Sequence, residues 1–382
     1  MVRVLIGNIF ESEAQTLVNT VNCVGVMGKG VALEFKKLFP DMYQDYLRRC
    51  AAKEVQLGKP YLFRPLLPPW TLNFPTKDHW RSVSRLSDII AGLEYLVRHY
   101  EEWGITSLAT PPLGCGQGQL EWRVVGPILY RHLSRLDIPV DLYAPQGAPQ
   151  AELDEIFLAS ETPDPMSQNF PNVSTITNDR DTKVPASWVA LVSILALVES
   201  QPYHWPVGRV MFQKIAYFAT ESGIPTGLVY KRGSYGPFAD DLKSLVTKLV
   251  NNGLLIEEHS NDMFITRVGP TYVDAVRAYR SDLNIWKPTI ERIADLFLRM
   301  NTKGAEIAAT IYFATQELTG VNVEPITETQ VLDAVKAWKI RRRPPLRENE
   351  IAQTIRSLNL LRWINVEQMH DLPVEDALLL GV

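Results

Sequence analysis

The sequence has few of the residues from which metal sites and disulfide frameworks are built. Its 382 residues include three cysteines and six histidines. Cys23, Cys50 and Cys115 are too widely spaced for a zinc site and too few for a disulfide-rich secreted domain. Cys23 and Cys115 also have no histidine close in the sequence to activate them, so we expect them to be packing residues. No metal ion and no cofactor is expected.

The sequence also lacks an excess of charge and a long apolar run. A net charge of −4 gives no general attraction to nucleic acids or anionic membranes, so any such contact must come from a local patch. The N-terminal segment MVRVLIGNIFE reaches charged residues too early for a signal peptide. No run approaches the roughly 18 apolar residues of a membrane span. These absences predict a cytoplasmic protein without membrane contact.

Strand and helix patterns alternate over residues 1–147. Short apolar runs predict strands at residues 2–6, 17–21, 105–110 and 140–143. The spacing of apolar residues predicts helices at residues 31–39, 87–103 and 122–133. Such alternation predicts an α/β layer fold.

The pattern changes after residue 147. Residues 148–183 are rich in Pro, Ser, Thr, Asn and Asp and predict a linker, apart from one short helix at 151–158. Residues 184–382 are mainly helical, with helices expected at 188–199, 210–221, 237–251, 272–300, 305–318, 328–339 and 348–358. Two short β runs within 254–268 follow one of these helices, an arrangement similar to half of a winged helix.

Two glycine-rich segments have the composition of an anion site. VNCVGVMGKGV (21–31) and PPLGCGQG (111–118) each follow a predicted strand and precede a predicted helix. Glycine lets the backbone approach a ligand, and a helix N-terminus favours a phosphate. The spacing matches neither the Walker A loop nor G-x-G-x-x-G. Because ligands of open α/β sheets bind beyond the carboxyl ends of the strands, the two loops are expected to hold a diphosphate between them.

Asn22 stands at the entrance of the first of these loops. Its amide offers both a donor and an acceptor to a sugar hydroxyl. An asparagine in this position also commonly holds its own turn by bonding to nearby backbone groups. The sequence leaves both roles open.

Three motifs of the first domain together resemble a macrodomain. They are GNIFESEAQTLVNTVNCVGVMGKGVALEFKKLFP, NFPTKDHWR and PPLGCGQGQLEW, within residues 1–146. The resemblance is closest to the branch that contains the terminal ADP-ribose glycohydrolases and the DarG-type antitoxins of DarT–DarG pairs. It implies a three-layer α/β/α fold and ADP-ribose as the ligand. The residues it places on the ligand are Asn8, Ile9, Asn22, Gly25, Val26, Met27, Gly28, Lys29, Gly30, Val31, Thr76, Pro112, Leu113, Gly114, Cys115, Gly116, Gln117 and Gly118.

A lysine carries the catalysis in this branch, and Lys77 in PTKDHWR matches it. A lysine attacks the anomeric carbon only if its pKa is lowered, which burial achieves by disfavouring the charged form. Without that context a lone lysine is a solvated surface charge. The neighbouring His79 and Trp80 either stack on a base or pack against the protein, and the sequence does not decide between the two.

The sequence departs from the family pattern at two positions. The branch member that acts on protein carboxylates pairs its lysine with an aspartate where this chain has Gly118. Many macrodomains have an aspartate for the adenine amino group where this chain has Asn8, whose carbonyl still accepts such a bond. The DarG type has the same style of second loop, and its substrate is ADP-ribose attached to thymine in single-stranded DNA.

Two further motifs resemble the Panacea domain of bacterial antitoxins, once catalogued as SocA-like. They are MFQKIAYFATESG and YKRGSYGPFADDLKSLVTKLVNNGLL, within residues 185–320. The resemblance implies a module that binds and neutralises a cognate DarT-type ADP-ribosyltransferase toxin. Within the second motif, Pro237 is expected in the first turn of a helix.

The sequence therefore predicts a DarG-type antitoxin with a macrodomain (1–147), a linker (148–183) and a helical toxin-binding domain (184–382). The macrodomain would act in DNA repair as a hydrolase that removes ADP-ribose from thymidine. Two other hypotheses stay open, namely an ADP-ribose reader without turnover and a winged-helix transcription regulator with a ligand-sensing macrodomain. For the regulator, the basic run KAWKIRRRPPLR (336–347) would contact DNA phosphates, although such a run is also typical of a solvated helix end.

Overall fold

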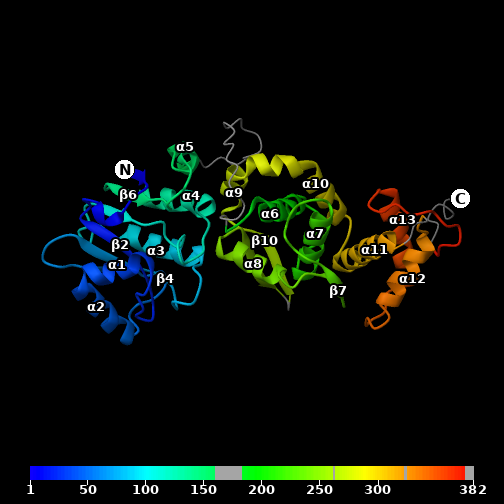
Figure 1. The fold of residues 1–382 in the computed structure, drawn as a ribbon, viewed down its shortest axis with the longest axis horizontal. Coiled ribbons are helices and arrows are strands. Elements are labelled where there is room, and N and C mark those ends of the chain that lie inside the picture. Colours follow the sequence, from blue (N-terminus) through cyan, green and yellow to red (C-terminus); the bar gives the residue numbers. More distant parts are fainter. Residues whose placement is uncertain (160–182, 261–262, 322–324, 375–382) are drawn as a thin grey trace. The chain divides into compact units, whose positions relative to one another are not determined.

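The computed structural model describes residues 1–159, 183–260, 263–321 and 325–374 (Figure 1). By their contacts the residues form two compact units. The first comprises Met1–Val189, Val246–Ile256 and Val268–Ile285, and the second comprises Ala190–Leu245, Glu257–Arg267 and Trp286–Val382. Most of the expected linker, residues 160–182, lies outside the described residues, so the domain boundaries drawn from the sequence stay a prediction.

A six-stranded sheet forms the centre of the first unit. Its strands are β1 (Val2–Leu5), β2 (Thr16–Asn22), β3 (Tyr61–Phe63), β4 (Trp70–Lys77), β5 (Leu108–Thr110) and β6 (Val140–Tyr143). They are ordered β1-β6-β5-β2-β4-β3, and every pair is parallel except β3–β4. The four predicted strands are confirmed, whereas β3 and β4 were not predicted. In β4, WTLNFPTK, polar residues and a proline hide the strand pattern, because proline is depleted in sheets.

Helices cover both faces of this sheet. On one face, Leu17 and Val21 of β2 share a buried cluster with Phe35 of α1 (Gly30–Leu38) and Tyr46 of α2 (Pro40–Ala51). Side chains alternate between faces along a strand, and Phe74 of β4 lies on the other face. There it contacts α3 (Leu86–His99) so closely that a Cβ on Gly92 would be 2.4 Å from the Phe74 ring. The expected three-layer α/β/α architecture is confirmed.

The helices of the first unit follow the predicted pattern with one omission. The helices α1 and α4 (Trp122–Leu133) occupy the predicted positions to within one residue, and α3 ends four residues before its predicted end. Pro40, directly after the first predicted helix, begins α2, which was not predicted. Proline is well suited to a first helical position because its missing N–H has no partner there in any case. The short helix expected at 151–158 is a turn of 3₁₀ helix at Gln150–Glu152 followed by α5 (Glu155–Ala159).

The chain beyond residue 183 is mainly helical, as expected. Its helices are α6 (Ala186–Glu199), α7 (Arg209–Glu221), α8 (Leu242–Asn251), α9 (Tyr272–Ala278), α10 (Arg280–Leu298), α11 (Thr302–Val321), α12 (Glu328–Trp338) and α13 (Glu348–Leu360). The predicted β runs form a two-stranded sheet of β9 (Leu255–Ser260) and β10 (Met263–Val268). Its turn, at residues 261–262, lies outside the described residues. None of the described helices has both the length and the apolar character that crossing a membrane requires.

Two helix predictions in this region were wrong. Pro237 does not begin a helix but lies in β8 (Gly236–Phe238), which pairs with β7 (Lys231–Gly233), and α8 starts only at Leu242. The buried Lys214 ammonium donates a 2.7 Å hydrogen bond to the Pro237 carbonyl, a tertiary contact that local sequence does not reveal. The helix expected at 272–300 is divided into α9 and α10 at Tyr279.

Candidate active site

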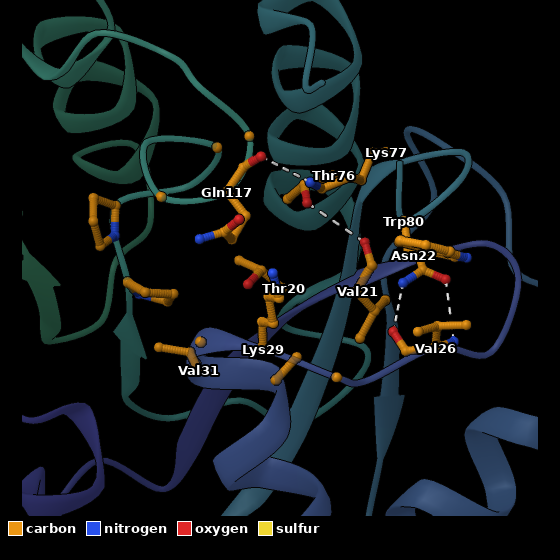
Figure 2. A pocket seen from close by; sticks show the side chains of 18 residues that line it. Thr20, Val21, Asn22, Val26, Lys29, Val31, Thr76, Lys77, Trp80 and Gln117 are labelled. Carbon is orange, nitrogen blue, oxygen red and sulfur yellow. Dashed lines mark hydrogen bonds between the residues drawn. The ribbon is translucent and has the colours of Figure 1, made fainter. Parts of the chain in front are cut away.

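Three loops enclose a pocket of about 660 Å³ at the carboxyl ends of β2, β4 and β5 (Figure 2). They are the first glycine loop (23–29), the β4–α3 loop (78–85) and the second glycine loop (111–121). The volume suits a small-molecule ligand. The lining residues are Thr20, Val21, Asn22, Val26, Gly28, Lys29, Gly30, Val31, Ala32, Thr76, Lys77, Trp80, Pro111, Pro112, Gly114, Gly116, Gln117 and Gly118.

Most of the residues predicted to bind the ligand are brought together in this pocket. Those predicted but outside the lining are Asn8, Ile9, Gly25, Met27, Leu113 and Cys115. Several of these have side chains in the core, so that they can offer a ligand only their backbone. The lining residues that were not predicted are Thr20, Val21, Ala32, Trp80 and Pro111. Val21 and Pro111 are the first residues of the two glycine motifs, and Thr20 and Ala32 directly flank the first motif, so counting whole motifs and their neighbours would have found these four.

The first glycine loop is held in place by Asn22. The Asn22 side-chain oxygen accepts hydrogen bonds from the backbone N–H of Val24 (3.0 Å) and Val26 (3.3 Å). Its amide nitrogen donates to the Val26 carbonyl at 2.6 Å (Figure 2). The buried Tyr46 hydroxyl donates to the Asn22 carbonyl at 2.8 Å. Asn22 thus has the turn-holding role, and the second hydrogen of its amide leaves a donor for a ligand. Its contact with a sugar stays a prediction.

The electrostatics of the pocket favour an anion. Gly30, in the left-handed region at φ 59°, starts α1, and the helix has no side-chain cap at its N-terminus. The unpaired N–H groups of this first turn carry partial positive charge toward the pocket, which Val31 and Ala32 line. The described lining includes the amines of Lys29 and Lys77 and no carboxylate. A diphosphate therefore fits the charge of the site.

The second glycine loop has no room for a side chain at Gly118. A Cβ there would lie 2.3 Å from Ser84 Oγ and 2.4 Å from the Gly114 carbonyl oxygen. The Ser84 N–H donates to the Gly118 carbonyl at 3.0 Å, which fixes this close approach. Gly116, by contrast, has open space beside it. Packing thus excludes any side chain at position 118, including an aspartate, unless the loop moves.

Residues distant in the sequence support the outer side of the second glycine loop. The Lys183 ammonium donates to the Cys115 carbonyl and to the Leu120 carbonyl (3.2 Å). Asn252 Oδ1 accepts a 2.7 Å hydrogen bond from the N–H of Glu121, whose side chain caps the start of α4. The loop that forms one wall of the pocket is therefore fixed by two residues that lie more than 60 positions further along the chain.

The two cysteines of the loops are packing residues, as expected. Burial raises the pKa of the Cys115 thiol to about 12 and that of the Cys23 thiol to about 11. Both therefore remain protonated near neutral pH, and a thiol is a poor nucleophile in that form.

Lys77 occupies the junction of the two glycine loops. It is the last residue of β4 and pairs in register with Asn22, the last residue of β2. Its ammonium donates a 3.0 Å hydrogen bond to the Gln117 carbonyl of the second glycine loop (Figure 2). Partial burial lowers the pKa of Lys77 below its usual range. A lowered pKa is the condition that the catalytic role requires, and it makes this amine more available for attack than that of a surface lysine. The catalytic role of Lys77 stays a prediction.

Comparison with known proteins identifies the family. Residues 18–129 match the macro domain family. A DNA ADP-ribosyl glycohydrolase from Thermus aquaticus is 33% identical over 323 residues, which cover 83% of this chain and 83% of that protein. The chain belongs to the DNA ADP-ribosyl glycohydrolase family.

Other similar proteins match shorter parts of the chain. A DNA ADP-ribosyl transferase–DNA ADP-ribosyl glycohydrolase fusion protein from Thermosipho africanus is 42% identical over 172 residues, which is 40% of this chain and 44% of that protein. The solved macrodomain of Thermus aquaticus DarG is 45% identical. The match covers 38% of this chain and 99% of that structure's chain, with a TM-score of 0.37. The resemblance to the DarG-type glycohydrolases, drawn from the sequence motifs, is confirmed by the family assignment.

Proposed function

We propose that this protein is an antitoxin whose macrodomain hydrolyses the N-glycosidic bond between ADP-ribose and thymidine in DNA. The observation that carries the proposal is a partly desolvated Lys77 at the junction of two glycine loops around an anion-favouring pocket. Membership of the DNA ADP-ribosyl glycohydrolase family supports the reaction class.

In this proposal the two glycine loops bind ADP-ribose by its diphosphate. The N-terminus of α1 and the Lys29 amine neutralise its charge. Asn22 donates its second amide hydrogen to the distal ribose, which is the one bonded to thymine. Asn8 accepts a hydrogen bond from the adenine amino group. ADP-ribose is the ligand and product, and the proposal requires no further cofactor.

Lys77 is the proposed nucleophile. The lone pair of its neutral amine forms a bond to the anomeric carbon, while the bond from that carbon to the thymine nitrogen breaks. The bond electrons leave with thymine, which takes up a proton. Water then hydrolyses the lysine–ribose adduct, which releases ADP-ribose and restores the amine. The loops contribute by orienting the anomeric carbon toward Lys77, an effect that lowers the entropic barrier.

The direct test uses a single-stranded oligonucleotide that carries ADP-ribosylated thymidine. The purified full chain should release free ADP-ribose and restore the unmodified strand. An oligonucleotide with the same sequence and no modification is the control. Tight binding of the modified strand without release of ADP-ribose would overturn hydrolysis and favour the reader.

The second part of the proposal assigns the residues beyond 184 to binding and neutralising a cognate DarT-type ADP-ribosyltransferase toxin. The resemblance of residues 185–320 to the Panacea domain supports it. The Thermosipho relative, named as a transferase–glycohydrolase fusion, joins the two activities in one protein.

Binding can be separated from hydrolysis in the full chain. A Lys77→Ala variant that cannot remove ADP-ribose should still co-purify with the toxin and protect cells that express it. Loss of both properties would contradict a separate binding function. A shift of promoter DNA without toxin capture would favour the transcription regulator instead.

A further inference from the structure

An exposed tryptophan stands at the rim of the pocket. Trp80 lines the pocket, yet 47% of its surface is exposed. It lies in the β4–α3 loop, three residues after Lys77, and Figure 2 draws it among the residues that line the pocket. This exposure excludes a place in the core for Trp80 and leaves packing on the surface and stacking on a base as its two possible roles. An exposed indole is a large apolar surface that a ligand can cover.

Two neighbouring side chains of the loop contact this indole. The His79 ring stacks on it with 5.5 Å between the ring centroids and an interplanar angle of 30°. The Arg81 guanidinium lies 4.6 Å from the Trp80 ring centroid, within cation–π range. The three side chains thus form one platform, in which the aromatic surface carries an adjacent positive charge.

Backbone hydrogen bonds fix the loop that carries the platform. Asp78 Oδ1 accepts from the His79 N–H at 2.7 Å, and His79 Nδ1 accepts from the Arg81 N–H at 3.2 Å. The Ser82 N–H donates to the His79 carbonyl at 2.9 Å. Asp78 is the one carboxylate among residues 78–85, and these bonds direct one of its oxygens to the backbone. A platform held in this way loses little conformational entropy when a ligand stacks on it.

We propose that Trp80, supported by His79 and Arg81, is a stacking subsite for a nucleobase of the DNA strand that enters with its ADP-ribose in the pocket. The inference rests on the proposed function. If Lys77 contacts the anomeric carbon, the base bonded to that carbon lies near Lys77, and the partly exposed Trp80 lines the same pocket. Stacking on an aromatic ring binds single strands with little dependence on sequence, because every base has a π face. The Arg81 charge adds attraction for the strand.

The experiment measures binding to Lys77→Ala proteins, which are expected to bind the modified strand without cleaving it. Full-length Lys77→Ala and Lys77→Ala/Trp80→Ala proteins are titrated with free ADP-ribose and with a single-stranded oligonucleotide carrying ADP-ribosylated thymidine. Loss of Trp80 should weaken oligonucleotide binding about 5- to 150-fold more than it weakens the binding of free ADP-ribose, as expected for one lost stacking contact. Trp80→Phe should restore much of the oligonucleotide affinity because a phenyl ring still stacks.

Trp70→Ala is a matched control. Trp70 begins the same strand and also stacks with an arginine, Arg64, at 4.8 Å, but it lies at the opposite end of β4 from Lys77. It should change neither affinity. Titration with ADP-ribosyl-thymidine, which has no flanking nucleotides, shows whether the modified thymine or a neighbouring base stacks on Trp80. Its binding should depend on Trp80 only if the modified thymine itself stacks.

Two results would overturn the inference. If Trp80→Ala lowered the affinities for free ADP-ribose and for the oligonucleotide equally, Trp80 would contact ADP-ribose rather than a DNA base. If it left the oligonucleotide affinity unchanged, Trp80 would not be a stacking subsite. Because neither titration depends on cleavage, failure of the proposed hydrolysis would be seen separately, as a lack of ADP-ribose release by the parent protein.

Discussion

The ammonium nitrogen of Lys77 and the carbonyl oxygen of Gln117 lie 3.0 Å apart and join β4 to the second glycine loop. The bond holds the candidate nucleophile at the lining of the pocket, and partial burial lowers its pKa. It also couples the position of Lys77 to the conformation of the loop. Changes to the loop are therefore expected to affect both ligand binding and the chemistry.

The pH dependence of cleavage should follow the Lys77 amine. Only the neutral amine attacks, so the single-turnover rate should rise with pH and level off above the pKa of Lys77. Since burial lowers that pKa, the inflection should fall below the usual value of a lysine. Lys77→Arg, which keeps the charge but cannot attack, should be inactive at every pH. A rate independent of pH through this range would argue against an amine nucleophile.

A carboxylate introduced at Gly116 should abolish ADP-ribose binding. Gly116 lines the pocket and has open space beside it, so Gly116→Glu should fold and fill the site with a charge that repels the diphosphate. Gly320→Glu, also at a position with open space but in α11, is the matched control for charge and size. Calorimetry should detect binding by the control alone. Equal affinities of the two variants would mean that the diphosphate binds elsewhere.

Gly118→Asp should not restore the lysine–aspartate pair of related glycohydrolases. A Cβ at this position would lie 2.3 Å from Ser84 Oγ and 2.4 Å from the Gly114 carbonyl, so the loop must move. We expect weaker ADP-ribose binding, a lower thermal midpoint and no gain in cleavage of ADP-ribosyl esters. Gly118→Ala should show the same losses, because the clash begins at Cβ. Faster ester cleavage by the aspartate variant would show that the loop tolerates a side chain.

Removing the support behind the second glycine loop should weaken binding from outside the pocket. Lys183→Met keeps the length of the side chain but leaves the Cys115 and Leu120 carbonyls without this donor. A buried acceptor that loses its partner costs about 1–3 kcal/mol. We expect lower ADP-ribose affinity by calorimetry and lower stability in urea. Lys287→Met removes an exposed lysine with a 4.0 Å ion pair and should leave both unchanged. Identical behaviour of the two variants would mean that the loop does not need this support.

Most of the candidate site could be predicted from contiguous sequence motifs. The remaining features depend on contacts between residues that are distant in the sequence. The glycine loops and Lys77 were predicted because their residues are contiguous. The strand β4, which places Lys77, was missed because Pro75 and Asn73 obscure its pattern, although β2 pairs with it along its length. The contact of Glu121 with Asn252 joins residues 131 apart, and no local pattern indicates it. Pro237 was misassigned for the same reason, since its partner, Lys214, is 23 residues away.

The measurement that tests the account most directly compares Lys77→Ala with the parent protein in two assays on the same preparations. Calorimetry should show ADP-ribose affinities within about tenfold, or ~1.4 kcal/mol, because the loops and the α1 N-terminus still bind the diphosphate. Release of ADP-ribose from an oligonucleotide with modified thymidine should be rapid for the parent and absent for Lys77→Ala. Cleavage by Lys77→Ala at the parent rate would contradict the central claim that this lysine is the nucleophile.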